Sequence, residues 1–417
     1  MLKILKDSSQ IVTVDTKGKN VKRGKEQSNL DILTDHSIVI EDDIIKDIIP
    51  TYSIKNRSNF ELISLKDKTI FPGFIECHTH TVYTGSRTNE FKLRLRGATY
   101  EEISNSGGGI KSTVNAVRNS SFDDLVKTAL PRIQSFISQG VTTLEIKSGY
   151  GLDFENETKL LEVINHLNKL FPIDIIATFL GAHTYPVEFN NDHGGYIDLL
   201  IKRMIPAVAE KRLAIFCDVF CESTGFSREE TDQILYAAIQ AGLKIKIHTE
   251  QFNNIGGLET ALKYGAVSVE HLEMMKDEQV SKLAASTTAA VLLPGVSYFL
   301  NYRYAPARKL IDENVIVAIA TDFNPGSSHI SNISLIMSLA AINMKMSIEE
   351  VITSYTINAA YALNKNNRTG SIETGKKADF AVIDSPEYSD IIYNTGTNLN
   401  IMTIKNGQVI FDKSEFK

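Results

Sequence analysis

Short apolar runs alternate with amphipathic segments along most of this chain. Eight runs have the length and apolar character of buried parallel strands, and they span residues 70–77, 141–147, 174–181, 214–221, 243–247, 266–269, 289–293 and 315–320. Segments with helical periodicity lie between them, such as 155–170 and 227–240, and the second opens with Ser227 and Glu230 as a capping box. Eight strands that alternate with helices predict an α/β fold, a (β/α)8 barrel of the TIM type.

The two ends of the chain carry a different pattern. Short runs with strand-like alternation recur at 37–40, 379–383 and 401–404, next to Asn-Gly and Asp turns. We therefore predict a small β-sandwich domain built from both termini, residues 1–69 and 366–417, beside a barrel domain of residues 70–365. The polar segment 17–31 is expected to be an exposed loop.

Composition narrows the class of protein. The 417 residues are 43% hydrophobic and 23% charged, with a formal net charge of −6. A nucleic-acid binder usually shows a basic excess, so this balance argues against nucleic acid as a partner. No apolar run approaches the roughly 18 residues of a membrane span, and the first ten residues lack the apolar core of a signal peptide. Only three cysteines are present, which fits a reducing compartment. We expect a cytoplasmic enzyme with no membrane partner.

Polar side chains gather where the predicted strands end. In a barrel the carboxyl ends of the strands form the active site, so these side chains should meet. They are His78, His80, Tyr150, His183, Glu222, His248, Glu270, His271, Thr321 and Asp322. Five of the nine histidines belong to this set. Histidines with unrelated structural roles in the core would not be expected to gather at strand ends. The other four, His36, His166, His193 and His329, are expected on the surface or in loops.

Four of these residues suit one metal ion. His78 and His80 point the same way because side chains alternate along a strand, and His248 and Asp322 complete three imidazoles and one carboxylate. This donor set fits a catalytic zinc or iron(II) ion that activates a water molecule. Asp322 can also accept a proton from that water. His271 is a candidate base or carbonyl polariser, with a purely structural hydrogen bond as the alternative.

A second metal is not expected. Bimetallic barrels commonly end the fourth strand with a modified lysine, whereas here that run ends in Cys221 and Glu222, and Lys147 ends the second run. Cys217 and Cys221 have no second pair for a zinc knuckle, so buried thiols are the better interpretation. We predict one zinc or iron ion per subunit.

Arg87 lies seven residues after His80, in a loop expected to lean over the metal. A guanidinium there can hold a substrate carboxylate in two parallel hydrogen bonds, although a solvated surface role is the alternative. Tyr100 and Tyr150 can add hydroxyl donors or serve in packing. The glycine run 107–109 is not a phosphate loop, because Ile110 stands where such a loop needs glycine before its lysine. A flexible loop beside the barrel mouth is expected instead.

Together these motifs resemble the amidohydrolase superfamily and, more narrowly, the imidazolonepropionase family of histidine degradation. The resemblance covers nearly the whole chain and is carried by residues 71–80, 106–110, 147–151, 181–183, 248–251, 270–272 and 321–326. The first and last segments mark only the superfamily, and the segments 106–110 and 147–151 narrow it to this family.

The resemblance implies hydrolysis of the cyclic amide C–N bond of 4-imidazolone-5-propanoate to N-formimidoyl-L-glutamate, by a homodimer. It implies that His78, His80, His248 and Asp322 bind the metal. It also implies that substrate or product contacts Arg87, Tyr150, His183, Gln251, Asn324, Gly326 and Ser327, to which we add Tyr100.

Two rivals stay open at this point. The first is another metal-dependent member of the superfamily, such as a cytosine or guanine deaminase. Those enzymes use a glutamate three residues after the strand-five histidine, where this chain has Gln251, although imidazolonepropionases themselves vary between glutamate and glutamine there. The second is a non-catalytic barrel, since a fold alone does not establish activity. Such relatives typically lose metal ligands, and all four are present here.

Overall fold

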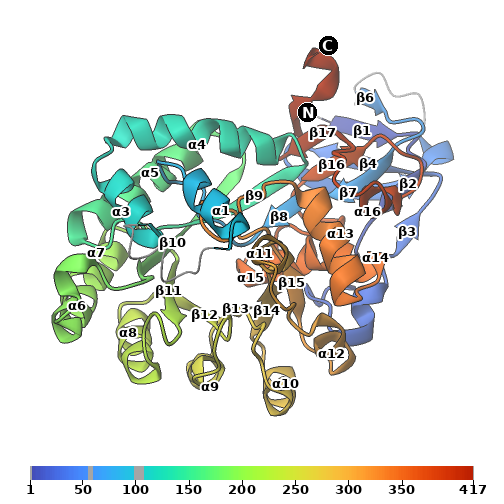
Figure 1. Ribbon diagram of the computed structural model, residues 1–417. Helices are drawn as coiled ribbons and strands as arrows, with labels where there is room; N and C mark the ends of the chain where they lie inside the picture. The colour runs from blue at the N-terminus through green and yellow to red at the C-terminus, as the bar shows by residue number, and fades with distance from the viewer. Residues whose placement is uncertain (1, 55–59, 98–107, 417) are drawn as a thin grey trace.

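The computed structural model describes residues 2–54, 60–97 and 108–416. In these residues the strands form one eight-stranded sheet, one four-stranded sheet and one six-stranded sheet. Figure 1 shows the eight-stranded sheet ringed by helices, with the two smaller sheets together at its side. Both chain ends lie at these smaller sheets, where blue N-terminal and red C-terminal strands run side by side. The α/β barrel with added sheets is thus confirmed.

The barrel strands are all parallel and follow one another in chain order around the sheet. They are β8 (Phe74–Glu76), β9 (Val141–Lys147), β10 (Asp174–Ala182), β11 (Phe216–Cys221), β12 (Lys244–Thr249), β13 (Ser268–His271), β14 (Ala289–Leu292) and β15 (Val317–Ile319). A parallel bridge between Thr79 and Phe323 joins the segments that follow β8 and β15. The first and last strands therefore meet at the edge where the catalytic side chains were expected.

One expected strand is wrong in an informative way. The run 70–77 is two strands, β7 (Thr69–Pro72) in the six-stranded sheet and β8 in the barrel. The break falls at Gly73, where a Cβ atom would stand 2.3 Å from the Oγ1 atom of Thr142. Glycine thus lets the chain pass close to β9 as it changes sheets. Periodicity could not reveal the break, because both halves are apolar and buried.

Helices connect the strands and cover the barrel (Figure 1). They are α1 (Thr88–Leu95), α3 (Ile110–Arg118), α4 (Phe122–Ile137), α5 (Phe154–Leu170), α6 (His193–Leu199), α7 (Ile205–Glu210), α8 (Arg228–Gln240), α9 (Gly257–Lys263), α10 (Asp277–Ala284), α11 (Pro294–Leu300), α12 (Ala307–Asp312), α13 (Ile333–Met344), α14 (Ile348–Ser354), α15 (Ile357–Ala362) and α16 (Asp390–Tyr393). The capping box of α8 is confirmed, since Ser227 accepts from the Glu230 amide and Glu230 accepts from the Ser227 amide.

The smaller sheets combine strands from both ends of the chain. The four-stranded sheet has the order β5 (Ile44–Pro50), β4 (His36–Glu41), β1 (Leu2–Lys6), β6 (Phe60–Ser64). The six-stranded sheet has the order β18 (Gln408–Asp412), β17 (Asn400–Lys405), β16 (Phe380–Ile383), β7, β2 (Gln10–Val12), β3 (Ile32–Leu33). One apolar cluster, including Leu5 and Ile38 of the first sheet and Ile70 and Phe380 of the second, lies between them. We propose that these sheets form one composite unit beside the barrel. Its expected bounds, 1–69 and 366–417 with the barrel at 70–365, leave out residues 70–72 of β7, which pair in the six-stranded sheet.

The segment 17–31 is not the exposed loop that its polarity indicated. It contains a short 3-10 helix (Gly24–Ser28), and Gln27 is fully buried. The Gln27 amide donates to the Val315 carbonyl, and Arg23 donates to the carbonyls of Ala284 and Ser286. Polar side chains are buried here because they satisfy backbone groups of the barrel, which a count of polar residues cannot show.

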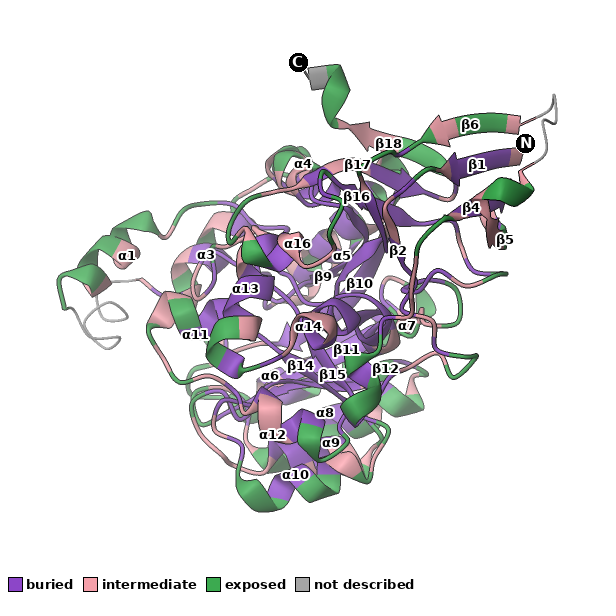
Figure 2. Ribbon diagram, turned by 90° about the vertical axis from the view of Figure 1, so that its right-hand side faces the viewer, coloured by how far each residue is buried: buried purple, intermediate pink, exposed green. Residues whose placement is uncertain are grey.

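Burial follows this architecture. Figure 2 shows buried strands at the centre of the molecule and exposed residues on the outer helices, with α1 standing away from the body. No residue of α1 is buried. In the part of the chain that the structure describes, none of the helices has the length and apolar character needed to cross a membrane.

Candidate metal centre and substrate cavity

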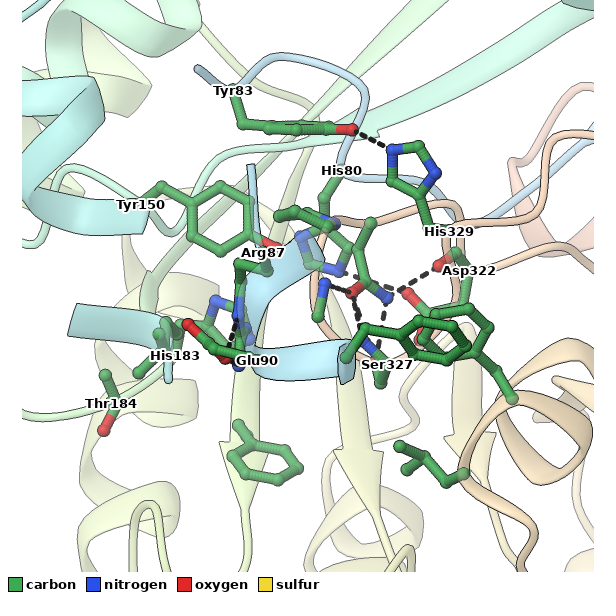
Figure 3. A pocket seen from close by; sticks show the side chains of 18 of the residues that line it. His80, Tyr83, Arg87, Glu90, Tyr150, His183, Thr184, Asp322, Ser327 and His329 are labelled. Atoms are coloured by element: carbon green, nitrogen blue, oxygen red, sulfur yellow. Dashed lines mark hydrogen bonds and ion pairs between the residues drawn. The ribbon is translucent and has the colours of Figure 1, made fainter. Parts of the chain in front are cut away.

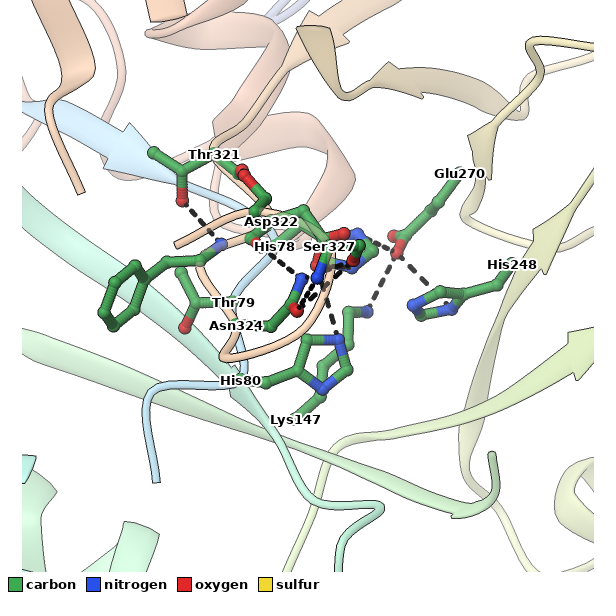
Figure 4. Close-up of polar contacts among 12 residues, drawn as sticks. His78, Thr79, His80, Lys147, His248, Glu270, Thr321, Asp322, Asn324 and Ser327 are labelled. Atoms are coloured by element: carbon green, nitrogen blue, oxygen red, sulfur yellow. Dashed lines mark hydrogen bonds and ion pairs between the residues drawn. The ribbon is translucent and has the colours of Figure 1, made fainter. Parts of the chain in front are cut away.

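Three histidines and one aspartate converge at the carboxyl end of the barrel (Figure 4). The nitrogens of His78, His80 and His248 that could bind a metal all lie within 4.8 Å of one another. Oδ1 of Asp322 is 3.2 Å from Nε2 of His78 and 3.5 Å from Nε2 of His80. None of the four side chains is more than 4% exposed. The residues chosen from the sequence as metal ligands are therefore neighbours in space.

The buried carboxylate of Glu76 ties the first and last strands of the barrel together. It accepts the Thr321 amide at 3.1 Å and the His78 amide at 3.4 Å, and the Tyr355 hydroxyl also donates to it. His78 lies two residues after the end of β8, and Asp322 lies three residues after the end of β15. Glu76 thus fixes the distance between the two segments that carry these candidate ligands.

The donor atoms themselves fit a cation. Within the described residues, Nε2 of His78, Nε2 of His248 and Oδ1 of Asp322 are buried without a hydrogen-bond partner. Buried polar atoms in proteins are nearly always satisfied, so three such atoms facing one space fit a bound cation. Imidazole nitrogens and a carboxylate oxygen are donors that zinc and iron(II) accept.

Carboxylates behind the histidines orient two of them. Oε2 of Glu270 lies 2.6 Å from Nδ1 of His78, and both oxygens of Asp218 lie 3.0 Å from Nδ1 of His248. Since the Nδ1 atoms face these carboxylates, the Nε2 atoms of both rings face the common centre. This arrangement is typical of metal-binding histidines.

Two buried lysines lie among the carboxylates behind the histidines. Lys147 and Lys246 are fully buried together with Glu145, Asp218 and Glu270. Burial by itself would lower the pKa of Lys147, but Asp218, Glu145 and Glu270 raise that pKa above its ordinary value. Burial would raise the pKa of Glu270, and Lys147, Lys246 and His78 instead hold it below its usual range. These groups therefore stay charged inside the barrel.

A cavity of about 750 Å³ opens above the candidate metal centre (Figure 3). Its lining includes most of the residues singled out in the sequence, namely His80, Arg87, Tyr150, His183, His248, Gln251, His271, Asp322, Asn324, Gly326 and Ser327. His78 lies deeper and is fully buried. Tyr100 and Gly107 lie outside the described residues. The volume suits a small organic substrate.

Arg87 reaches into this cavity from the start of α1. Its Nε and Nη2 atoms both donate to Oε2 of Glu90 at 2.7 Å, which leaves Nη1 toward Gly326. The side chain is only 17% exposed, so the alternative of a solvated surface arginine does not apply. Glu90 was not recognised from the sequence, although a carboxylate three residues after an arginine on a helix is a readable signal.

The loop that carries Tyr150 is held by a carboxylate that was not recognised from the sequence. Glu157, in the first turn of α5, accepts the amides of Gly149, Gly151 and Leu152 at 2.7 to 3.1 Å. Burial raises the pKa of Glu157, and its hydrogen bonds to the backbone oppose that shift. Glu157 therefore shapes the loop that places Tyr150 in the cavity.

His183 presents one ring nitrogen to the cavity. Its Nδ1 atom lies 3.0 Å from the Gly149 carbonyl, and a carbonyl only accepts, so Nδ1 carries the proton. Burial, with His248 beside it, lowers the pKa of His183 to about 4. The ring is thus neutral near pH 7, with Nε2 as a hydrogen-bond acceptor.

A second buried carboxylate holds the loop that carries Gln251. Glu222 accepts the Gln251 amide at 2.6 Å, together with the amides of Phe252 and Asn253. Glu250 points elsewhere, since it accepts the Thr249 hydroxyl and the Leu258 amide. The residue that lines the cavity at this strand end is therefore the amide Gln251, which cannot move a proton.

The side chain of Asn324 organises the loop that follows β15. Its side-chain oxygen accepts the amides of Gly326 and Ser327 at 2.8 Å, and its Nδ2 donates to the Asp322 carbonyl. His271 ends β13 with a φ of 85°, a strained conformation for a non-glycine residue. Its Nδ1 lies 3.6 Å from Glu273, and the ring lines the cavity.

The remaining histidines and the cysteines lie largely where expected. His329 is in an exposed loop, yet it also lines the cavity, with its Nε2 atom 3.0 Å from the Tyr83 hydroxyl. His166 and His193 are exposed, whereas His36 begins strand β4 and is partly buried. Cys77, Cys217 and Cys221 are free and buried, which agrees with the interpretation of buried thiols.

The carboxylates and lysines behind the histidines had a signal that went unused. Glu145 and Lys147 stand two apart in one apolar strand, as Lys246 and His248 do in another. Charged residues with period two inside an apolar run point to the same face of the strand. In a barrel that face is the interior, so such residues must find partners there.

A family model described as "Amidohydrolase family" matches residues 69–410. This span covers most of the chain, which therefore belongs to the amidohydrolases. Within them its relatives are imidazolonepropionases. One from Clostridium tetani is 42% identical, over 99% of this chain and 98% of that protein. One from Thermoanaerobacter pseudethanolicus is 45% identical, over 90% of each. The chain is a member of that narrower family.

Solved structures agree with the fold. An adenosine deaminase from Xanthomonas campestris with bound zinc has a TM-score of 0.73 at 17% identity, over 99% of this chain and 93% of its own. The guanine deaminase of E. coli has a TM-score of 0.74 at 14% identity, over 99% and 100%. At such identities the likeness concerns the fold alone.

Proposed function

We propose that this protein hydrolyses 4-imidazolone-5-propanoate to N-formimidoyl-L-glutamate, a reaction of L-histidine degradation. Relatives that carry the name imidazolonepropionase match nearly its whole length at 40 to 45% identity. The reaction adds water across the cyclic amide C–N bond. The hydroxyl of water goes to the carbonyl carbon, and the ring nitrogen leaves with a proton.

One observation carries this proposal beyond family membership. A single cavity holds the Arg87 guanidinium and three of the candidate metal-binding side chains, His80, His248 and Asp322. The substrate needs both features, because its propionate is an anion and its ring amide is the bond to be broken. Arg87 would hold the propionate while the ring lies over the metal centre.

We propose one zinc or iron ion per subunit, held by His78, His80, His248 and Asp322. The unsatisfied donor atoms described above support a single cation at this place. Such an ion, when bound, acts as a Lewis acid that makes water a usable nucleophile near pH 7. Three imidazoles and one carboxylate suit either metal.

Asp322 and His271 are the proposed catalytic residues. Asp322 would take the proton of the attacking water and return it to the leaving ring nitrogen. His271 would polarise the ring carbonyl from the neighbouring strand. Both line the cavity, so both can reach a bound substrate.

The remaining proposed contacts orient the substrate. Nε2 of His183 can accept an N–H of the imidazolone ring, because Nδ1 is committed to the Gly149 carbonyl. Tyr150, Gln251 and Ser327 can donate hydrogen bonds, and the loop of Asn324 and Gly326 would contact the product. We also propose Tyr100 as a hydroxyl donor to the substrate carboxylate, from its position in the sequence and not from the family resemblance.

We further propose a homodimer, as the family resemblance implies, and a cytoplasmic location, as the composition indicates. Three free and buried cysteines are compatible with a reducing compartment. Light scattering coupled to size-exclusion chromatography gives the mass in solution. A mass of one subunit at micromolar concentration would contradict the dimer.

The experiment for the activity is direct. Protein loaded with zinc or iron(II) is incubated with 4-imidazolone-5-propanoate, and N-formimidoyl-L-glutamate is followed by mass spectrometry. Guanine and cytosine serve as competing substrates, because deaminases share this fold. Turnover of a nucleobase without turnover of the imidazolone would overturn the proposal.

A further inference from the structure

A second group of side chains beside the candidate metal centre also has cation-binding geometry. Asp218, His248 and Glu270 offer donor atoms that lie within 4.8 Å of one another. The side chain of Lys147 fills this group. Its Nζ atom is 2.8 Å from Oδ2 of Asp218 and 2.9 Å from Oε2 of Glu270. The protein thus supplies a positive charge of its own next to the histidines.

Lys147 is linked to the histidines through these two carboxylates, and Figure 4 shows its contact with Glu270. Asp218 contacts Nδ1 of His248, and the same Oε2 atom of Glu270 that faces Lys147 lies 2.6 Å from Nδ1 of His78. The Lys147 ammonium therefore contacts both carboxylates that orient the rings of His78 and His248. The third candidate ligand lacks such support among the described residues, because His80 contacts a carboxylate through Nε2, at Asp322, and not through Nδ1.

We propose that Lys147 is a built-in cation of the metal centre. It occupies the place of a second metal ion and positions Asp218 and Glu270, so that Nε2 of His248 and Nε2 of His78 face the single bound metal. This inference rests on the metal centre that we propose above. Lys147 is a positioning residue, since its carboxylate partners and not its own atoms touch the ligands.

The burial of Lys147 excludes the ordinary role of a solvent-exposed surface lysine. Its side chain is fully buried, and so are its three carboxylate partners, which include Glu145 at 3.3 Å. Removing the ammonium would leave carboxylates unpaired in a medium of low polarity, where they would turn away or take up protons. Either response releases the imidazoles from their orientation.

Lys246 offers a matched control. It is equally buried and equally surrounded by carboxylates, with Nζ 2.9 Å from Oε1 of Glu145 and 3.1 Å from Oε1 of Glu270. It touches neither Asp218 nor the Glu270 oxygen that holds His78 in the described contacts. A general loss of a buried charge would affect both lysines alike, whereas positioning of the ligands concerns Lys147.

The test measures zinc binding instead of activity. K147M and K246M are compared with the unmodified protein by competition with a chromophoric chelator, and bound zinc is counted by mass spectrometry. Loss of a group behind metal ligands typically weakens metal binding about 10- to 100-fold, and we expect this for K147M. For K246M we expect less than about threefold. Unchanged affinity in K147M, or equal losses in both variants, would overturn the inference.

Two further measurements keep the test decisive. If the unmodified protein binds no zinc or iron(II), the proposed metal centre itself is wrong, and this inference with it. If K147M does not fold, as judged by circular dichroism, K147M/D218N is compared with D218N. The double variant removes one buried charge of each sign. We expect it to bind zinc several-fold more weakly than D218N, because Oε2 of Glu270, the oxygen beside His78, has lost the ammonium that faces it, and equal affinities would contradict the inference.

Discussion

The guanidinium of Arg87 lies where a side chain at Gly326 would begin. A Cβ atom on Gly326 would stand 2.2 Å from Nη1 and 2.9 Å from the central carbon of the Arg87 guanidinium. Glycine at this position therefore leaves room for the guanidinium in the substrate cavity, and the loop after β15 contacts the residue that precedes α1.

Substitution of Gly326 by alanine should displace Arg87. The added methyl group cannot fit at 2.2 Å, so the guanidinium must rotate away from the propionate. We expect KM for the imidazolone to rise about tenfold, from the loss of roughly 1.4 kcal/mol of binding, with metal content unchanged. Steady-state kinetics measure this. G194A is the control, because a Cβ atom there meets nothing within 4 Å. Equal kinetics for G326A and the unmodified protein would contradict the contact.

Replacement of Arg87 by methionine should raise KM more strongly. Charge-assisted hydrogen bonds to a carboxylate contribute about 1.5 to 3 kcal/mol, which corresponds to roughly a 10- to 100-fold increase in KM. Zinc content should stay the same, because Arg87 touches none of the candidate ligands. R96M removes an exposed arginine at the end of the same helix and should leave KM unchanged. An unchanged KM in R87M would remove Arg87 from the substrate site.

Glu157 should matter through Tyr150. Oε1 of Glu157 accepts the amides of Gly149, Gly151 and Leu152, and Oε2 accepts the Gly149 amide as well. A glutamine at 157 keeps one acceptor oxygen but places a buried NH2 donor against the Gly149 N–H. We expect E157Q to raise KM roughly 5- to 150-fold, since leaving a buried donor unpaired costs about 1 to 3 kcal/mol. E155Q, exposed in the same helical turn, should have no effect.

A double variant separates positioning by Glu157 from general destabilisation. If Glu157 acts through the loop of Tyr150, the double variant Y150F/E157Q should have a KM only slightly above that of the more impaired single variant. Kinetics of all four proteins and a thermal melt of each provide the measurement. Fully additive losses in KM would show that Glu157 acts elsewhere.

Removal of the metal should lower stability. Without a cation, the buried donor atoms of His78, His248 and Asp322 have no partner, and the ligand no longer favours the folded state. We expect a chelator to lower Tm, and added zinc or iron(II) to restore it in proportion to the logarithm of its concentration. Differential scanning fluorimetry measures the shift. In H78A the chelator should change Tm little, and a full shift in that variant would place the metal elsewhere.

The candidate ligands could be found from the sequence because each is tied to a local feature. His78, His80, His248 and Asp322 follow or end apolar strands, and parallel strands of a barrel bring those ends together whatever their spacing along the chain. The capping box of Ser227 and Glu230 is local in the same sense, since its two residues are three apart. Local pattern and the rules of one fold are sufficient for such residues.

Other features depend on distant partners. The first expected strand divides at Gly73 because its halves pair with β16 and β9, and no local signal states those partners. Glu157 appeared as one more polar residue of an amphipathic helix, and its burial follows from the loop that folds over it. The segment 17–31 is partly buried because the barrel offers carbonyl groups to its polar side chains.

The sequence by itself determined the alternation of strands and helices, the helix caps and the set of candidate metal ligands, because these depend on neighbours a few residues away. Only the tertiary structure decided that Lys147 lies between Asp218 and Glu270, that Glu90 engages Arg87 and that Arg87 lies against Gly326. The physical reason is that a buried charge takes whichever opposite charge the closed barrel brings within about 3 Å, and that choice is made by strand order and register.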